Sequence, residues 1–271
     1  MRYLVPVLLL VLVILLGANL ITETVTPAQL GLTRTPLIQG QKWRVHDMQR
    51  PQPKVVVPAN GDEPVPPPSD AIVLFDGKNF DHFRNKDLLI EDGAMVMGPG
   101  GQETVDPFGD VQLHVEWTAP DPPQDDGQNR GNSGIVLMGL YEVQVLDSYQ
   151  SPTYPDGQAA ALYGQHPPMV NASKAPGRWQ TYDIFFRAPR FAADESLVSP
   201  AYVTVVHNGV LVQLHHPYLG PPRWRSNSQY RHHAEKLPLA LQWHRSPVRY
   251  RNIWIRPLDE YNALDEAARS N

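Results

Sequence analysis

The sequence contains no cysteine in its 271 residues. This excludes disulfide bonds, thiolate zinc sites and cysteine nucleophiles, and it leaves no cysteine for a bacterial lipid anchor. An excess of positive charge is missing as well, because 23 Lys and Arg stand against 28 Asp and Glu, for a formal net charge of −5. A chain without a basic stripe lacks the electrostatic footprint of a nucleic-acid-binding protein, so we expect no nucleic-acid partner.

Several common enzyme motifs are also absent. The chain has no G-x-S-x-G, no P-loop and no G-x-G-x-x-G between a strand and a helix. Ser133 has no histidine in a triad order, which disfavours a serine hydrolase. A helical period is seen only in the tail, residues 258–269, and no repeat has the period of a solenoid or propeller.

The N-terminal segment, residues 1–22, has the pattern of an export signal. Arg2 precedes a long apolar run, which is followed by Gly17 and Ala18. This order is typical of a secretory signal peptide, and the alternative is an uncleaved membrane anchor. Either way we expect the rest of the chain to be periplasmic, secreted or membrane-anchored outside the cytoplasm, with membrane contact only through this segment.

Proline is unevenly distributed in the next segment, residues 23–70. The chain has 28 prolines, and many of them fall between positions 51 and 70. Such density favours extended polyproline geometry over helix or central strand. We therefore interpret residues 23–70 as an N-terminal arm and Pro-rich linker, with 51–70 as a semi-rigid spacer.

Residues 71–258 contain short apolar-alternating runs separated by turn signals, and 42% of the whole chain is hydrophobic, enough for a real core. The Asn208-Gly209 pair suits the type I′ turn of a hairpin. About a dozen short strands with regular turns predict an all-β sandwich, with residues 259–271 as a C-terminal tail. The expected strands are 71–75, 88–90, 94–97, 111–117, 134–138, 141–146, 181–187, 201–207, 210–215, 239–243 and 252–257.

The run from Tyr141 to Asp147 is the most informative of these strands. Because side chains alternate faces, Glu142 and Gln144 share one face and the valines the other. An ordinary solvent-facing strand would show the same pattern. However, Glu and Gln are poor strand formers, and a bulge would let Asp147 reach the same face. Sugars are bound by such carboxylates and amides, so the strand suggests a carbohydrate ligand.

Two other segments offer matching polar groups. The loop before residue 134 contains Asn132 and Ser133, and a later strand places Gln242 and His244 on one face. Arg251 could clamp sugar hydroxyls or a carboxylate, or it could pair with a structural carboxylate such as Glu142 or Asp147.

Metal binding is a weaker possibility. Ten histidines are present, yet none has the i, i+4 spacing of a helical zinc motif. The acidic loop 121–127 could bind calcium through its oxygens, or it could simply be solvated. No cofactor is certain from the sequence, and a divalent metal, calcium or another, remains possible.

The chain resembles the 3-keto-disaccharide hydrolase family, whose members have a concanavalin A-like lectin/glucanase sandwich, or jelly roll. The resemblance runs in order through short motifs over residues 72–257. They are Leu-Phe-Asp-Gly-Lys-Asn at 74–79, Ile-Glu-Asp-Gly at 90–93, residues 108–117, Asn-Ser-Gly-Ile at 132–135, the central 141–147, Ala-Leu-Tyr at 161–163, Gly-Arg-Trp-Gln at 177–180, His-Asn-Gly at 207–209, Leu-Gln at 241–242 and Arg-Asn-Ile at 251–253.

The resemblance implies cleavage of glycosidic bonds in 3-keto sugars, by hydrolysis or elimination. Such a reaction needs a general base and a group that stabilises the enolate, and a divalent metal could supply the second. The residues expected to be catalytic are Glu142, Asp147 and His244. Those expected to bind substrate are Asn132, Ser133, Gln144, Tyr163, Gln242 and Arg251.

Three functions therefore compete. The first is an exported glycan-cleaving enzyme, which would act by elimination or through a Glu142–Asp147 carboxylate pair. The second is a non-catalytic carbohydrate-binding or adhesion module, which a proline spacer would suit. The third is a scaffold of the cell envelope.

Overall fold

The computed structural model describes residues 34–59 and 61–258. The expected signal segment 1–22 and the tail 259–271 lie outside the described residues, so both remain predictions. Across the described ranges, none of the helices is long and apolar enough to span a membrane.

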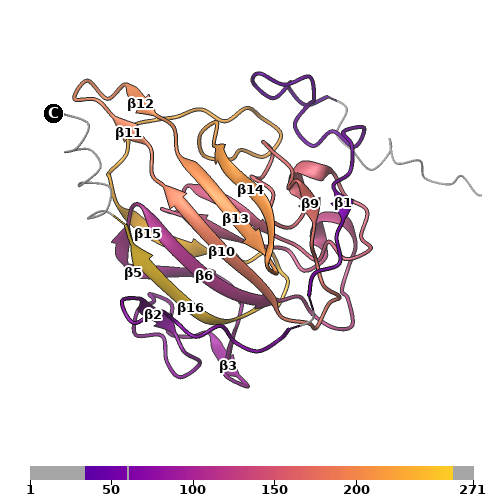
Figure 1. The fold of residues 1–271 in the computed structure, drawn as a ribbon, viewed down its shortest axis with the longest axis vertical. Coiled ribbons are helices and arrows are strands. Elements are labelled where there is room, and N and C mark those ends of the chain that lie inside the picture. Colours follow the sequence, from indigo (N-terminus) through magenta and orange to yellow (C-terminus); the bar gives the residue numbers. More distant parts are fainter. Residues whose placement is uncertain (1–33, 60, 259–271) are drawn as a thin grey trace, which may run out of the picture.

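The described residues form two large antiparallel sheets (Figure 1), which confirms the predicted all-β sandwich class. The larger sheet has the order β14-β13-β10-β6-β16-β4-β3, and β2 pairs with β16. Its strands are β2 (Ile72–Phe75), β3 (Leu89–Glu91), β4 (Ala94–Val96), β6 (Val111–Thr118), β10 (Gln180–Arg187), β13 (Tyr202–His207), β14 (Val210–Pro217) and β16 (Arg249–Pro257).

The smaller sheet has the order β5-β15-β7-β8 and lies behind the larger one in Figure 1. Its strands are β5 (Gln102–Phe108), β7 (Ser133–Leu137), β8 (Tyr141–Val145) and β15 (Leu237–Leu241). Two further pairs join β1 (Lys54–Val55) to β9 (Val170–Asn171) and β11 (Arg190–Phe191) to β12 (Leu197–Ser199). Short 3₁₀ turns occur at Gly127–Asn129 and Pro155–Gly157.

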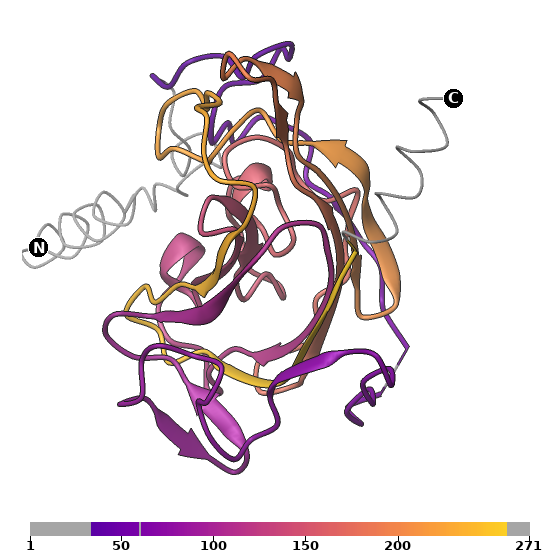
Figure 2. The same ribbon diagram turned by 90° about the vertical axis from the view of Figure 1, so that its left-hand side faces the viewer.

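The core lies between the two sheets, which face each other in the side view of Figure 2. On β10, Tyr182, Ile184 and Phe186 are buried in this core, while the residues between them are more exposed. Tyrosine hydroxyls also join the layers: Tyr182 donates to the carbonyl of Gln144 at 2.9 Å. This alternation is the strand period seen in the sequence, so the apolar face of each strand fixes which side meets the other sheet.

Several expected elements are confirmed by the structure. The β13–β14 hairpin turns at Asn208 and Gly209, which have φ values of 53° and 77°. Both positive values are those of the type I′ turn that Asn-Gly favours. The strand β5 was not expected, because Glu103, Asp106 and Pro107 interrupt its pattern. It lies at the edge of the smaller sheet, where proline and charge are tolerated.

Part of the Pro-rich segment is bound to the sandwich, which corrects the expectation that residues 51–70 form a semi-rigid spacer separate from the domain. Its Val65 amide donates to Glu116 at 3.0 Å, and Arg178 and Arg256 pair with Asp62 and Asp70, each at 2.6 Å. Polyproline geometry leaves backbone groups unpaired, and here polar side chains of the sandwich bind several of them. Residues 61–70 are called the strap below.

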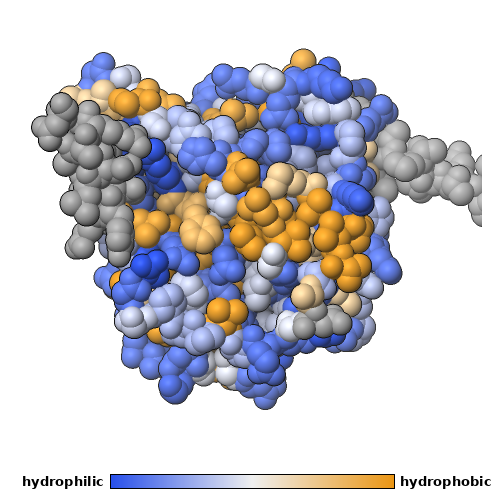
Figure 3. Space-filling model, in the orientation of Figure 1, coloured by the Kyte–Doolittle hydropathy of each residue, from blue (hydrophilic) through white to orange (hydrophobic). Residues whose placement is uncertain are grey.

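The outer face of the larger sheet is turned toward the viewer in Figures 1 and 3. It is mostly hydrophilic, with a hydrophobic patch near its centre (Figure 3). Phe185 and Leu214 are two of the apolar side chains that these strands expose. This patch is apolar, whereas strand β8 of the smaller sheet carries the polar side chains Glu142 and Gln144.

Candidate functional site

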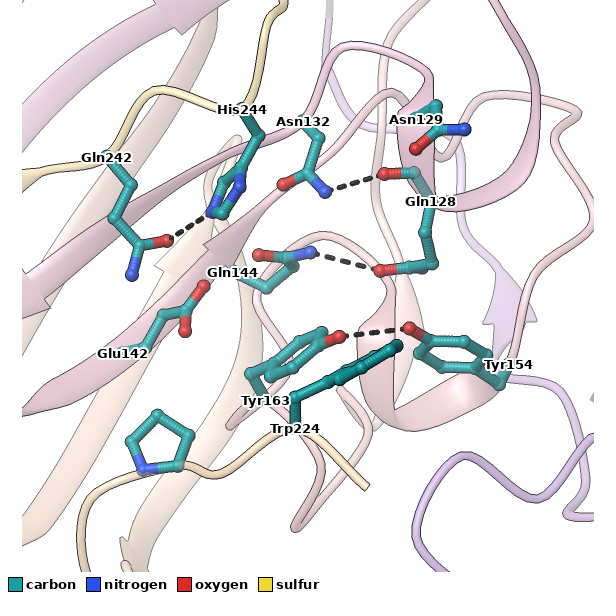
Figure 4. A pocket seen from close by; sticks show the side chains of 11 residues that line it. Gln128, Asn129, Asn132, Glu142, Gln144, Tyr154, Tyr163, Trp224, Gln242 and His244 are labelled. Carbon is teal, nitrogen blue, oxygen red and sulfur yellow. Dashed lines mark hydrogen bonds between the residues drawn. The ribbon is translucent and has the colours of Figure 1, made fainter. Parts of the chain in front are cut away.

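A cavity of about 510 Å³ opens on the face of the smaller sheet that is turned away from the core. Tyr141, Val143 and Val145 of β8 point into the core, so Glu142 and Gln144 point the other way, into the cavity. Loops from four parts of the chain surround these two side chains (Figure 4). The lining residues are Gln128, Asn129, Asn132, Glu142, Gln144, Tyr154, Tyr163, Pro222, Trp224, Gln242 and His244.

Glu142 provides the cavity's central acidic group. Its side chain is nearly buried, with 6% of the residue exposed. Burial raises the pKa of this carboxyl to about 8, although a hydrogen bond from Gln242 acts in the opposite direction. Since desolvation disfavours the charged form, Glu142 holds its proton at neutral pH.

The amide of Gln144 can adapt to either charge state of Glu142. In one orientation its nitrogen donates to Gln128 Oε1 at 3.3 Å and to the Gly157 carbonyl at 3.4 Å. In the other it donates to Glu142 Oε1 and to the Ser133 carbonyl, each at 2.9 Å. A protonated Glu142 suits the first orientation, because the carboxylic acid can then donate to the amide oxygen. An ionised Glu142 suits the second.

His244 lies exposed at the mouth of the cavity, above Gln242 (Figure 4). Its Nε2 is 3.0 Å from Gln242 Oε1, and an amide oxygen can only accept, so Nε2 carries the proton and Nδ1 the lone pair. Partial burial lowers the pKa of His244 below its usual value. At neutral pH the imidazole is therefore uncharged and able to accept a proton.

A glycine makes room for this group of side chains. The backbone amide of Gln242 donates to the Gly134 carbonyl at 2.9 Å, which places the segment after β15 beside β7. A Cβ at Gly134 would lie 2.6 Å from Gln242 Oε1 and 2.7 Å from Glu142 Oε1. Only glycine lets the two side chains approach there. The Asn-Ser-Gly motif thus contributes to the cavity both through Gly134 and through the side chain of Asn132.

Aromatic side chains form another wall. The hydroxyls of Tyr154 and Tyr163 point toward each other and are 3.0 Å apart. Burial raises the pKa of Tyr163 to about 12 and raises that of Tyr154 further, so both phenols remain protonated. Trp224 is 65% exposed, and the Arg225 guanidinium lies over its ring at 4.1 Å. Such a surface suits stacking against a sugar ring.

Six of the nine expected site residues line the cavity: Asn132, Glu142, Gln144, Tyr163, Gln242 and His244. Ser133 instead bonds Tyr250 at 2.7 Å inside the sandwich. Asp147 does not line the cavity, because its side chain is buried and accepts a hydrogen bond from Arg130 Nε at 2.7 Å. Burial raises the pKa of Asp147, and the Arg130 charge opposes that rise.

Arg251 lies on the other sheet. Its Nε donates to Glu116 at 2.7 Å, and its guanidinium stacks on Trp179 at 4.1 Å. The structural partner of Arg251 is therefore Glu116, a residue that the sequence did not suggest, rather than Glu142 or Asp147. Strand periodicity says which face a side chain occupies but not which strand lies next to it.

Five lining residues were not expected from the sequence, and all lie in loops. They are Gln128, Asn129, Tyr154, Pro222 and Trp224. One available signal was a pair of aromatic residues, Tyr154 and Trp224, each set among prolines and polar residues. Large aromatic side chains in such loops are typical of binding surfaces rather than of cores.

The cavity offers little negative charge to a divalent metal. Among its lining residues Glu142 has the one carboxyl, which is protonated at neutral pH, and His244 has the one imidazole. The Asn and Gln side chains add neutral amide oxygens of a kind that calcium also accepts. Elsewhere in residues 34–59 and 61–258, no three His, Cys, Asp or Glu side chains gather as a metal site.

Comparison with known proteins places the chain among glycan-directed proteins. Residues 70–256 match the model of the 3-keto-alpha-glucoside-1,2-lyase-like domain. The crystal structure of a candidate glycosyl hydrolase from Parabacteroides distasonis ATCC 8503 is 40% identical, with a TM-score of 0.69, covering 81% of this chain and 99% of that one.

Two other candidate glycosyl hydrolases of that organism match at lower similarity. One is 18% identical over 70% of this chain and 94% of its own, and the other is 22% identical over 69% and 99%. Both have a TM-score of 0.49. None of the curated proteins compared with the chain matches it.

Proposed function

This chain belongs to the family of 3-keto-alpha-glucoside-1,2-lyase-like domains, and from that premise we propose that it cleaves the glycosidic bond of 3-keto-glucosides by elimination across C1 and C2. The observation that carries the proposal is the pairing of a protonated Glu142 with a neutral His244 around Gln242 in a cavity lined by amides and aromatic rings. Two groups whose pKa values are pushed in opposite directions provide an acid and a base at the same pH.

The chemistry requires the two roles to act in order. The ketone at C3 acidifies the hydrogen on C2, and a base removes that proton to give an enolate. The enolate electrons then form the C1–C2 double bond and restore the ketone, while the C1–O bond breaks. An acid gives its proton to the departing oxygen, and later addition of water across the double bond makes the net reaction a hydrolysis.

We assign the base to His244 and the acid to Glu142. His244 Nδ1 carries a lone pair at neutral pH, and Glu142 still holds a proton. Tyr154 and Tyr163 carry two hydroxyl protons, and the hydrogen bond between the two hydroxyls takes up one of them. The other proton can be donated to the enolate oxygen. Trp224 would stack on the sugar, and the amides would bind its hydroxyls.

The arrangement of carboxyls favours elimination over ordinary glycoside hydrolysis. Retaining and inverting glycosidases place two carboxyl groups on either side of the scissile bond. Among the residues that line this cavity, Glu142 alone has a carboxyl, and Asp147 is paired with Arg130 outside it. A one-carboxyl site suits a substrate whose own ketone acidifies the C2 hydrogen, because no second carboxylate is then needed as a nucleophile or to activate water.

A chromogenic 3-keto-α-glucoside tests the assignment. We expect Glu142→Gln and His244→Asn each to lower kcat/KM by about a hundredfold or more, the scale of a lost acid or base. Asp147→Asn is the matched control, because it also changes a carboxyl to an amide, and it should change kcat/KM by less than about threefold. Full turnover in Glu142→Gln would remove Glu142 from the mechanism.

The route is tested by running the reaction in D₂O. Elimination followed by hydration places deuterium on C2 of the product sugar, whereas direct hydrolysis leaves C2 unlabelled. Mass spectrometry of the product therefore separates the two routes. Binding of the glucoside without turnover would favour the second function, a carbohydrate-binding module, for which the exposed Trp224 is also suited.

We also propose that the protein is exported, on the strength of the apolar segment in residues 1–22. Fractionation of cells that make the full chain tests this idea. Recovery in the cytoplasm would contradict it, and N-terminal sequencing of exported material would tell a cleaved signal from a retained anchor.

A further inference from the structure

Residues 34–52, called the arm here, precede the family match at 70–256 but contact the cavity wall. Within the arm, Val45 and His46 are fully buried, and a bridge between Leu37 and Arg44 folds it on itself. Gln52 donates to the Thr153 carbonyl at 3.1 Å, which places the end of the arm beside the loop that carries Tyr154. The arm is therefore part of the folded body.

The first connection runs through His46. Its ring centroid is 4.1 Å from that of Tyr154 and 5.0 Å from that of Tyr163, the two residues whose hydroxyls meet in the cavity. The His46 backbone amide donates to Asp156 Oδ2 at 2.8 Å. His46 has a φ of 61°, a left-handed conformation that a non-glycine residue seldom adopts without such support.

The role of His46 is set by its burial. Both His46 and Asp156 have side chains with no exposure, and the nearest ring nitrogen is 3.6 Å from Asp156 Oδ2. Neither ring nitrogen makes a hydrogen bond within the described residues. A ring so enclosed cannot reach a substrate, so it acts by packing behind the two tyrosines.

The second connection runs through Gln165. Gln41 donates to its carbonyl oxygen at 3.1 Å, and Arg50 does so at 3.4 Å. The Gln165 side chain in turn joins both ends of the loop that carries Trp224. It donates to the Gly220 carbonyl at 2.9 Å and to Ser228 Oγ at 3.1 Å, and it accepts from the Leu219 amide at 2.7 Å.

We propose that the arm is a built-in part of the active site, and that His46 is a positioning residue that holds Tyr154 and Tyr163 in place for substrate binding. The proposal rests on the proposed function for its substrate. It adds that a segment outside the sandwich holds the aromatic side chains of the cavity in position. His46 packs against Tyr154 and Tyr163, and Gln165 connects the arm to the loop that carries Trp224. The arm acts through Tyr154 and Tyr163 rather than through the acid and the base.

The experiment compares four variants of the full chain. His46→Ala removes the packed ring, and His46→Phe keeps a ring without nitrogen atoms. Arg50→Met removes the hydrogen bond to Gln165, and Gln49→Ala is the control, because that side chain is exposed on the same segment. Kinetics with the chromogenic 3-keto-α-glucoside are paired with hydrogen exchange of residues 154–165 and 219–228.

We expect His46→Ala to lower kcat/KM by about tenfold, through a higher KM and a lower kcat, because both tyrosines bind the substrate and donate to the enolate, and to speed exchange in 154–165. Arg50→Met should speed exchange in 219–228, while His46→Phe and Gln49→Ala stay near the wild type. A His46→Ala protein with unchanged kcat/KM and exchange would overturn the proposal. So would a His46→Phe protein that loses kcat, because the imidazole would then be needed for chemistry.

The two proposals can fail separately. A wild-type protein that does not turn over the glucoside would contradict the proposed function, and hydrogen exchange would still decide whether the arm orders the aromatic walls. If His46→Ala does not fold, Arg50→Met carries the test through the 219–228 loop. Unchanged exchange in that loop would then count against the proposal.

Discussion

At the scale of the residue, burial makes Glu142 and His244 chemically useful. One strand position places a carboxyl where water is scarce, and its pKa rises to about 8. His244, nearer the opening, has its pKa lowered by partial desolvation. At neutral pH both groups are therefore uncharged. In a fully solvated pair the Glu pKa lies below the His pKa, so no pH leaves both side chains mostly neutral.

The raised pKa of Glu142 predicts a pH-dependent stability. Its folded pKa of about 8 lies above the usual glutamate pKa of 4.5, so between these pH values the folded state holds a proton that the unfolded state has lost. The free energy of unfolding should therefore fall as pH rises from about 4.5 to 8, with a slope of about 1.4 kcal/mol per pH unit from this group. Below 4.5 its contribution should be constant.

Glu142→Gln provides the measurement, because glutamine resembles the neutral acid at every pH. In urea titrations, the stability of Glu142→Gln relative to the wild type should increase from pH 5 to pH 8 and then level off. A difference between the two proteins that does not vary with pH would show that Glu142 ionises normally in the folded state.

At the scale of the element, the buried carboxylate of Glu116 adds to the ion pairs of Asp62 and Asp70 that hold the strap. Burial by itself would raise the pKa of Glu116, but hydrogen bonds from His114, Asn252 and Arg251 bring it below its usual value. The Val65 amide bonds to the same carboxylate. Glu116 therefore joins the larger sheet to the strap, and its removal leaves several polar groups without their acceptor.

We expect Glu116→Ala to lower the free energy of unfolding by about 3 kcal/mol, as when one partner of a buried ion pair is lost. Hydrogen exchange of residues 62–66 should also become faster. Asp70→Asn is the control, since Asp70 pairs with Arg256 with half its side chain exposed, and its loss should lower the free energy of unfolding far less than Glu116→Ala does. Equal losses in the two variants would contradict this explanation.

The elements also show what the sequence could predict. Alternation identified most strands of the larger sheet and the shared face of Glu142 and Gln144, because burial on one face leaves a period of two. It did not reveal β5, where an edge position tolerates Pro107. It also misjudged residues 51–70, because proline density reports backbone geometry and not the surface against which the segment lies.

At the scale of the whole molecule, two buried histidines make the free energy of unfolding rise with pH, whereas Glu142 makes it fall. Burial lowers the pKa of His207 to about 3 and that of His166 to about 4. Both remain neutral in the folded state where the unfolded chain would bind protons. Their contribution to stability is complete above the unfolded pKa of about 6.5 and is lost as pH falls toward 3 or 4.

These opposing terms predict a stability maximum near pH 6.5. Between pH 4.5 and 6.5 the free energy of unfolding rises with pH, because the gain from the two histidines is larger than the loss from Glu142. Above pH 6.5 the histidine contribution is constant, so the loss from Glu142 lowers the free energy of unfolding. Thermal unfolding followed from pH 4 to 9 should give the highest Tm close to pH 6.5. A maximum below pH 5 or above pH 8 would mean that other groups control the balance.

The cavity also shows why loop residues escape prediction at this scale. Tyr154 and Trp224 come from positions far apart in the chain and line the same cavity, and their loops are hydrogen-bonded to Gln52 of the arm and to Gln165. No periodicity in the sequence predicts that two distant loops will line the same cavity. Short-range patterns identify a polar strand, whereas long-range packing decides which groups stand opposite it.

The division of the cavity between strands and loops has a consequence for its evolution. Glu142 projects from a strand whose other face is locked into the core, so its place in the active site is hard to change. Pro222 and Trp224 belong to a loop joined to the body mainly through Gln165. Exchanging residues 221–227 for those of a relative should therefore alter which sugar is accepted while the acid and base stay in place.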